Sequence, residues 1–175
     1  MFRVGVIIVS DKGSRGERED LSGPILIELV QDLDGEVVEY VVIPDDQTLL
    51  AEKMCQWADE LRLDLIFTTG GTGFSMRDVT PEATLAVADR LVPGIAEVMR
   101  LESLKVTSRA MLSRAVAVLR KQTLIINMPG SPKALRECFA AIAPAIPHGL
   151  EILKGEAGEC ATTISEGDKN CTVLG

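Results

Sequence analysis

Short apolar runs rich in β-branched residues alternate with amphipathic segments along this chain. A continuous apolar run of this kind is typical of a strand that is buried on both faces of a parallel sheet. The last two runs are separated only by Lys121 and Gln122, which predicts a hairpin that adds an antiparallel pair to the sheet. The predicted strands are Val4–Val9, Val37–Ile43, Leu63–Phe67, Ala115–Arg120 and Thr123–Met128.

Apolar residues at helical spacing predict helices between and after these strands. Within one of these helices Leu50, Met54 and Trp57 share a face, so we expect Trp57 in the core. The segment Val106–Arg114 has no clean period and is expected to be partly helical. The alternation predicts an α/β fold with a mostly parallel central sheet and helices on both faces. The predicted helices are Pro24–Asp32, Gln47–Leu61, Glu82–Asp89, Pro93–Leu104, Lys133–Ala143 and Leu150–Leu153.

A glycine-rich stretch, TTGGTGFSMRDVTP at positions 68–81, connects a predicted strand to a predicted helix. Gly70, Gly71 and Gly73 can take positive φ and have no side chain, so their amides can approach phosphate oxygens. Asp78 lies between these glycines and the helix, so its carboxylate would lie beside the bound anion. A carboxylate beside phosphates usually acts through a divalent cation.

A structural interpretation of the same stretch is also open. The sequence Thr-Pro-Glu at 80–82 predicts a helix start with a hydroxyl cap and a proline in the first turn. The glycines would then make a tight turn, and Asp78 would only help to cap the helix. The stretch also lacks the Lys-Ser/Thr ending of a Walker A loop, so local sequence alone does not decide between the two interpretations.

Two other predicted turns leave the sheet at the same end as the glycine-rich stretch. Asp45 and Asp46 follow the second strand, and the turn 129–132, Pro-Gly-Ser-Pro, follows the last one. Ligands of open parallel sheets bind at the carboxyl ends of the strands. One of the two aspartates can instead cap the following helix, and this alternative stays open. The first strand ends at Ser10 and Asp11, before a long polar loop that we interpret as a candidate mobile flap.

Composition and length narrow the class of protein. The chain has 175 residues, so we expect one domain over residues 1–154, followed by a polar tail over residues 155–175. A net charge of -8 without a Lys/Arg block argues against nucleic-acid binding. The chain shows neither a signal-peptide pattern nor an apolar run that could span a bilayer, so we expect a soluble cytoplasmic protein without a membrane partner.

The reactive side chains of this chain argue against a His-rich metal site and against hydrolysis by a Ser-His-Asp triad. His148 is the only histidine, it precedes the last predicted helix, and we interpret it as structural. The cysteines have no metal-ligand spacing, and we expect Cys55 and Cys138 to be core thiols. The glycine-rich turns with the carboxylates of Asp45 and Asp78 suit phosphoryl or nucleotidyl transfer, in which positioning and charge neutralisation supply most of the rate. Arg77 is a candidate phosphate ligand or, equally, a partner in a surface ion pair, and Lys133 is another nearby cation.

Four separated motifs carry a resemblance to a known family. TTGGTG, RDVTPEAT, IPDD at 43–46 and NMPGSP at 127–132 resemble, in content and order, the motifs of the molybdopterin adenylyltransferase family, which includes the G domain of gephyrin. The resemblance covers roughly Arg3 to Lys154. It implies a three-layer sandwich of the molybdopterin-binding-domain type. It also implies a step of molybdenum cofactor biosynthesis: transfer of AMP from ATP to the terminal phosphate of molybdopterin, with release of pyrophosphate.

The resemblance also assigns roles to residues. Asp45 and Asp78 match the two motif aspartates, which implies a catalytic role in holding Mg²⁺ together with ATP. An ionised phosphate is already a nucleophile, so no general base is needed. The residues that would bind nucleotide or molybdopterin are Ser10, Asp11, Gly70, Gly71, Thr72, Gly73, Gly130 and Ser131.

The family resemblance further implies a homotrimer and a transient contact with the molybdenum-inserting enzyme. The alternative is a non-catalytic or weakly catalytic molybdopterin-binding homologue or scaffold of the same fold. The related domain of the metal-inserting enzyme typically departs from GTG and lacks RD-x-TPEA, whereas this chain keeps both. An adenylyltransferase is therefore the favoured interpretation.

Overall fold

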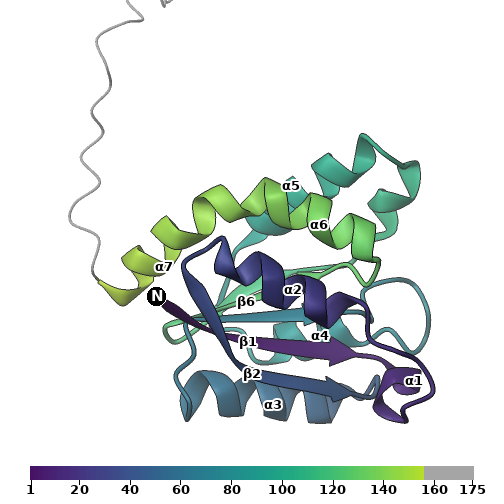
Figure 1. Cartoon of the computed structure of the whole chain (residues 1–175), viewed down its shortest axis with the longest axis horizontal. Helices are drawn as coiled ribbons and strands as arrows, with labels where there is room; N and C mark the ends of the chain where they lie inside the picture. Colours follow the sequence, from purple (N-terminus) through teal and green to yellow (C-terminus); the bar gives the residue numbers. More distant parts are fainter. Residues whose placement is uncertain (156–175) are drawn as a thin grey trace, which may run out of the picture.

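A six-stranded sheet forms the centre of the protein in a computed structural model that describes residues 1–155 (Figure 1). The strands lie in the order β2-β1-β3-β6-β5-β4. Strands β2, β1, β3 and β6 are parallel, whereas β5 runs antiparallel to both of its neighbours. The prediction of a mostly parallel sheet with an antiparallel hairpin is therefore confirmed. The bounds are β1 Phe2–Val9, β2 Gly35–Ile43, β3 Leu65–Thr69, β4 Arg90–Leu91, β5 Ala117–Arg120 and β6 Thr123–Met128.

Helices cover both faces of the sheet, which gives the three expected layers (Figure 1). Side chains alternate between the faces along a strand, so in β1 Val4 and Val6 belong to one core and Ile7 and Val9 to the other. The first core packs against α2 Ser22–Gln31, α5 Pro93–Leu104, α6 Pro132–Ile142 and α7 Ile146–Lys154. The second packs against α3 Gln47–Asp59 and α4 Thr80–Ala86, and contains Trp57, as predicted.

Several local predictions need correction. The expected loop after β1 begins with a short helix, α1 Asp11–Ser14, because the Ser10 hydroxyl accepts a hydrogen bond from the Gly13 amide and caps it. The last helix starts at Ile146 after a 3-10 turn, so His148 lies inside it and not before it. The segment without a clean period contains a 3-10 helix, Ser108–Leu112, which confirms that it is partly helical.

The end of β3 is also displaced from its prediction. The strand continues to Thr69 because two buried threonines have hydrogen-bond partners. The Thr68 hydroxyl accepts a bond from the Asn127 side-chain amide at 2.9 Å, and the Thr69 hydroxyl donates to the Pro129 carbonyl at 2.9 Å. Buried polar groups that are paired in this way are compatible with a core strand. Further on, the predicted helix Glu82–Asp89 is shorter, and the unpredicted strand β4 follows it.

Other predictions concern single residues and the chain end. Cys138 is buried, as expected, whereas Cys55 is only partly buried. The predicted polar tail, apart from Gly155, lies outside the described residues, as do Cys160 and Cys171. The division into a domain of residues 1–154 and a tail therefore stays a prediction. Within residues 1–155 the structure contains no helix of the length and apolarity that a membrane crossing requires.

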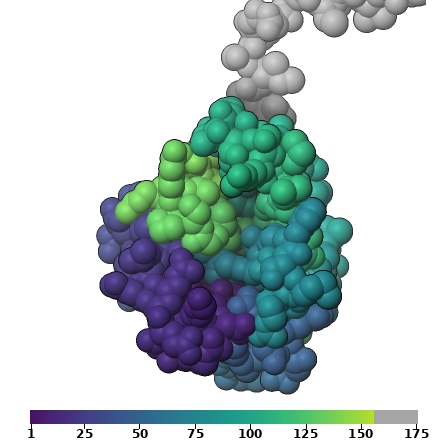
Figure 2. All heavy atoms as spheres, turned by 90° about the vertical axis from the view of Figure 1, so that its right-hand side faces the viewer, coloured from purple at the N-terminus to yellow at the C-terminus, as the bar shows by residue number. Residues whose placement is uncertain are grey.

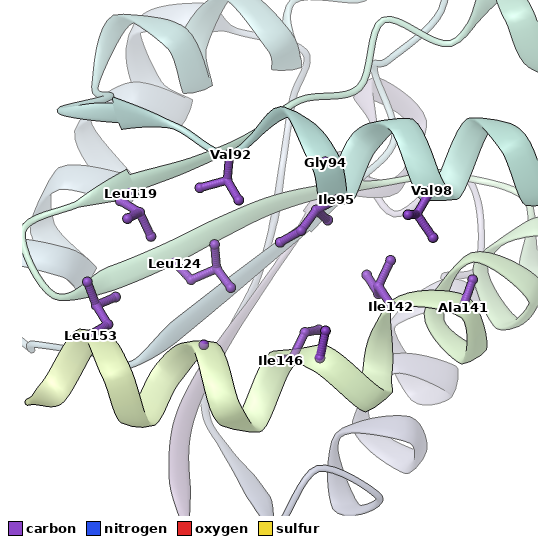
Figure 3. A pocket seen from close by; sticks show the side chains of 12 residues that line it. Val92, Gly94, Ile95, Val98, Leu119, Leu124, Ala141, Ile142, Ile146 and Leu153 are labelled. Carbon is purple, nitrogen blue, oxygen red and sulfur yellow. The ribbon is translucent and has the colours of Figure 1, made fainter. Parts of the chain in front are cut away.

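An apolar cavity of about 300 Å³ lies between α5, the β5–β6 hairpin and the segment that contains α6 and α7 (Figure 3). Leu119 and Leu124 from the hairpin and Ile146 from α7 face the same space in Figure 3. None of the predicted site residues lines this cavity. The site predicted from the sequence must therefore be sought elsewhere, at the carboxyl ends of the parallel strands.

Candidate active site

The carboxyl ends of β1, β2, β3 and β6 form one rim of the sheet, which we call the carboxyl rim. Figure 2 shows this rim from the front, where the purple surface of the segment that follows β1 meets the teal surface around residue 75. Strands β1 and β3 end side by side, with Ile8 opposite Thr69, and β3 and β6 end with Thr69 opposite Met128. The turns after these strands therefore start from neighbouring points, as the parallel-sheet argument requires.

The glycine turn at the end of β3 is built by close backbone approach. Gly70 has φ of +100°, and a Cβ there would lie 2.3 Å from the carbonyl oxygen of Val9. Gly71 has φ of +63°, and its Cβ would lie 2.5 Å from the Thr80 hydroxyl and 3.1 Å from Oδ1 of Asp45. Side chains other than hydrogen are therefore excluded at both positions. Gly73 is not in the positive-φ region, contrary to expectation, but a Cβ there would lie 2.8 Å from Oδ2 of Asp78.

Thr80 holds this turn against α4 instead of capping the helix. The N-cap residue is Val79, which makes no side-chain cap bond, so the predicted hydroxyl cap is wrong. The Thr80 hydroxyl donates to the Gly70 carbonyl at 2.9 Å, and the Thr80 amide donates to the Gly71 carbonyl at 3.1 Å. The glycine turn and the start of α4 are therefore joined by two hydrogen bonds through one residue.

The two aspartates after β2 have different roles. The Asp46 side chain accepts a hydrogen bond from the Leu49 amide at 2.9 Å and caps α3. Asp45 faces the rim, where its Oδ2 accepts a bond from the Asp11 amide at 2.9 Å, and its own amide donates to Oδ1 of Asp11 at 3.1 Å. The alternative that one of the pair is only a cap is thus correct for Asp46.

Burial and like charge make Asp45 an unusual carboxyl. Burial raises its pKa above the ordinary value, and the charges of Asp11 and Asp78 raise it further, whereas the Asp11 amide lowers it. A Cβ on Gly71 would lie 3.1 Å from Oδ1 of Asp45, and a Cβ on Gly73 would lie 2.8 Å from Oδ2 of Asp78, so both carboxylates lie against the same turn. The two acids that the sequence analysis singled out are therefore brought together at the carboxyl rim.

Arg77 forms an ion pair with Asp11, which lies at the same rim. Its guanidinium donates to both carboxylate oxygens of Asp11, from Nη2 at 2.8 Å and from Nε at 3.0 Å. This contact lowers the pKa of Asp11. The ion-pair interpretation of Arg77 is therefore correct for this structure. Asp11, Asp45 and Asp78 together still carry more negative charge than Arg77 compensates.

A small polar hollow of about 100 Å³ lies at the end of β1. Ser10, Thr69 and Gly130 line it together with the segment 18–22. Gly130 lies against Gly70, and the Ser22 hydroxyl donates to the Gly130 carbonyl at 3.1 Å. Ser131 is exposed at the N-cap position of α6 without a side-chain cap bond. The turn after β6 thus joins the glycine turn, as expected for a third loop at this end.

Comparisons with known proteins identify the family of this chain. A family model described as "Probable molybdopterin binding domain" matches residues 5–148. The chain belongs to the molybdopterin-binding domain family.

Relatives of this family are similar over most of their length. A molybdopterin adenylyltransferase of Helicobacter pylori (strain J99) is 42% identical over 156 residues, which cover 88% of this chain and 89% of that protein. The Escherichia coli (strain K12) molybdopterin adenylyltransferase is 40% identical over 177 residues, covering 93% and 91%. The crystal structure of the molybdopterin biosynthesis enzyme MoaB from Thermus thermophilus has a TM-score of 0.84 and 49% identity, covering 89% and 98%.

One residue of this molybdopterin-binding domain was missed by the sequence analysis. Arg114 precedes β5, and its side chain donates to the Gly73 carbonyl from Nε at 2.7 Å and to the Asp78 carbonyl from Nη2 at 2.6 Å. It also forms an ion pair with Glu82. These contacts connect residues far apart in the sequence, so the only signal was a charged residue at the edge of an apolar run.

The carboxylates of this domain fit a magnesium ion that is bound together with a nucleotide. Within residues 1–155 there is no group of three or more His, Cys, Asp or Glu side chains that could hold a metal alone. Magnesium does not need such a group, because it usually takes one or two carboxylates, waters and phosphate oxygens. Asp45 and Asp78 supply that number of carboxylates, beside the amides of the glycine turn.

Proposed function

We propose that the protein is a molybdopterin adenylyltransferase of molybdenum cofactor biosynthesis. One observation carries the proposal: the carboxylates of Asp45 and Asp78 both lie against one turn, whose glycines leave no room for side chains. Similarity over most of the chain to proteins named molybdopterin adenylyltransferase supports it. The substrates would be ATP and molybdopterin, and the products adenylylated molybdopterin and pyrophosphate.

The proposed step needs no general base. An oxygen of the terminal phosphate of molybdopterin attacks the α-phosphorus of ATP, a new P–O bond forms, and the bond to the β-phosphate oxygen breaks. The electron pair of that bond leaves with pyrophosphate. The attacking phosphate is ionised near neutral pH, so positioning and charge neutralisation supply the rate.

Different residues of the carboxyl rim would have different roles in this transfer step. Bound Mg²⁺ would neutralise negative charge on the phosphates, held by Asp45 and Asp78 with the nucleotide oxygens. The glycine turn with Thr72 and Gly73 would offer backbone amides to phosphate oxygens. Ser10 and Asp11 on one side, and Gly130 and Ser131 on the other, would complete the binding surface for nucleotide and molybdopterin.

We propose further that the protein works as a homotrimer in the cytoplasm and passes its product to a molybdenum-inserting enzyme. The family resemblance supports the trimer, and exposed apolar side chains on and after α5, Val98, Leu101, Leu104 and Val106, offer surface for copies of the chain to pack. Measurement of the molar mass by light scattering during gel filtration tests the trimer, which a monomer mass would refute.

The function is tested by incubating the protein with molybdopterin, Mg²⁺ and ATP labelled in the α-phosphate. We expect label in molybdopterin and one pyrophosphate for each molecule labelled. Omission of molybdopterin should abolish pyrophosphate release, which controls for hydrolysis of ATP. Binding of molybdopterin without any transfer of label would instead identify a non-catalytic homologue or scaffold.

A further inference from the structure

Arg114 connects the two ends of the segment that carries Asp78. Its backbone amide donates to the Thr72 carbonyl at 3.0 Å. The side chain reaches Gly73 at the start of the segment, Asp78 at its end, and Glu82 in the first turn of α4. One side chain thus fixes the base of a loop whose tip, with Met76 97% exposed, lies in solvent.

Asp78 lies in a small turn within this loop. The segment folds into a small turn in which the Asp78 amide donates to the Ser75 carbonyl at 2.9 Å and Oδ2 of Asp78 accepts the Ser75 amide at 2.9 Å. These bonds fix the carboxylate relative to its own turn only. The hydrogen bonds of Arg114 to the carbonyls of Gly73 and Asp78 then fix the turn relative to the sheet.

We propose that Arg114 is a positioning residue that holds the Asp78 carboxylate in place for the nucleotide-bound metal. This inference rests on the proposed function, because it assigns the use of the same site. Arg114 does not act as a phosphate ligand, since Glu82 compensates its charge and two carbonyls take its other arms. A lysine keeps the charge but cannot reproduce the planar fork that binds several acceptors at once.

Arg120 offers a matched control for Arg114. It lies at the other end of β5, pairs with Asp59 of α3, and donates from Nη1 to the Val87 carbonyl at 3.0 Å. Arg114 therefore holds the start of α4 and Arg120 the residue that follows its end, each through a carboxylate and backbone carbonyl oxygen. Only Arg114 touches the segment with Asp78, so the two substitutions separate positioning of Asp78 from general support of α4.

The test measures binding of Mn²⁺, as a paramagnetic substitute for Mg²⁺, in the presence of α,β-methylene ATP by electron paramagnetic resonance. We expect Arg114→Lys to weaken Mn²⁺ binding about tenfold, the range typical for residues that orient metal ligands. Arg120→Lys should leave Mn²⁺ binding unchanged within about twofold, whatever its effect on the melting temperature. Equal weakening by both variants would overturn the inference. Arg114→Gln replaces Arg114→Lys if the latter does not fold.

A double-mutant cycle shows whether Arg114 acts through Asp78. On the background of Asp78→Asn, the substitution Arg114→Lys should change Mn²⁺ binding by less than about twofold, because the group that it positions is already altered. A full tenfold effect on that background would contradict the inference. Glu82→Gln leaves both carbonyl contacts of Arg114 in place, so it should affect binding less than Arg114→Lys; an equal effect would assign the role to charge instead.

The Mg²⁺ dependence of the rate and amide hydrogen exchange also test the positioning role of Arg114. In the adenylyl-transfer assay, Arg114→Lys should raise the Mg²⁺ concentration for half-maximal rate about tenfold, and excess Mg²⁺ should restore most of kcat. Amide hydrogen exchange in the segment 72–79 should be faster in Arg114→Lys and unchanged in Arg120→Lys. A wild-type protein without turnover would refute the proposed function, while the Mn²⁺ titrations would still decide the role of Arg114.

Discussion

Two carboxylates at the carboxyl rim, Asp45 and Asp78, lack the ion pairs that Asp59 and Asp64 form at the opposite edge of the sheet. At the amino ends of the parallel strands, which we call the amino rim, Asp59 pairs with Arg120 and Lys121, and Asp64 pairs with Lys154 at 2.9 Å. At the carboxyl rim, neither Asp45 nor Asp78 forms an ion pair with any described residue.

The pKa values of Asp59 and Asp45 differ in the same way. The hydrogen bond from Arg120 lowers the pKa of Asp59, whereas burial raises that of Asp45. Carboxylates that stabilise a fold are paired within the protein, because burying an uncompensated charge is costly. The negative charge of Asp45 and Asp78 is the charge that the proposed Mg²⁺ would neutralise.

The largest expected effect is on turnover at the carboxyl rim. Asp45→Asn and Asp78→Asn should each lower kcat/KM for ATP by about 100-fold or more, since loss of a few kcal/mol of charge stabilisation corresponds to that factor. Molybdopterin binding, measured by fluorescence titration, should remain. Asp59→Asn at the amino rim is the matched control and should keep kcat/KM near wild type. Wild-type turnover in both carboxyl-rim variants would remove their catalytic assignment.

Alanine substitutions at Gly70 and Gly35 compare the cost of a side chain at the two rims. Gly70→Ala should destabilise the protein by several kcal/mol, about 3 or more, because it combines positive φ with a Cβ placed 2.3 Å from the Val9 carbonyl oxygen. Gly35→Ala, at the start of β2 on the amino rim, meets Cγ1 of Val30 at 2.9 Å and the Val30 carbonyl oxygen only at 3.1 Å, without a positive φ, and should cost less. Urea unfolding measures both, and equal losses would mean that the close approach at Gly70 is not limiting.

Thr80 tests the connection between the glycine turn and α4. Thr80→Val removes a fully buried hydroxyl that donates to Gly70, so the free energy of unfolding should fall by about 1–3 kcal/mol, the cost of a buried group left unpaired. Thr80→Ser keeps the hydroxyl and serves as the control. If the valine variant is as stable as the serine variant, the bond to Gly70 does not hold the turn.

The smallest effect concerns acid stability at the amino rim. The pKa of Asp59 is lower in the folded protein than in the unfolded chain, where it is about 3.9, so its pairing stabilises the fold above that pH and is lost as pH falls through the folded value. Asp59→Asn should therefore lower the melting temperature at pH 7 by more than at about pH 3. An equal decrease at both pH values would show that packing, and not charge, explains the loss.

The sequence predicted the sheet well because buried parallel strands are continuous apolar runs. It misplaced the end of β3, where Thr68 and Thr69 are polar but are paired with Asn127 and the Pro129 carbonyl. Those partners come from β6 and the turn after it, so no local pattern could reveal them. The same limit applies to Thr80, which matched a cap by its position but bonds to Gly70 instead.

At the candidate site, too, the sequence predicted what depends on local order and missed contacts between residues far apart in the chain. The sequence placed Asp45, Asp78 and the glycine turn at one rim, because strand direction determines where each loop emerges. Local sequence could not decide which of Asp45 and Asp46 caps α3, although the family resemblance selected Asp45 as the metal ligand. The bond of Asp46 to the Leu49 amide identifies the cap. Arg114 was missed because its side-chain partners lie between positions 73 and 82.

The reversed direction of β5 has a consequence for how this sheet can be modified. A parallel strand delivers only the residues that follow it to the ligand, whereas β5 delivers the residues that precede it. Insertions before β5 would therefore alter ligand contacts, and insertions after it would fall on the far side of the sheet. Among the loops of this domain, the segment that leads into β5 offers a place to vary specificity without substituting the glycines or the aspartates, provided that Arg114 keeps its bonds to the carbonyls of Gly73 and Asp78.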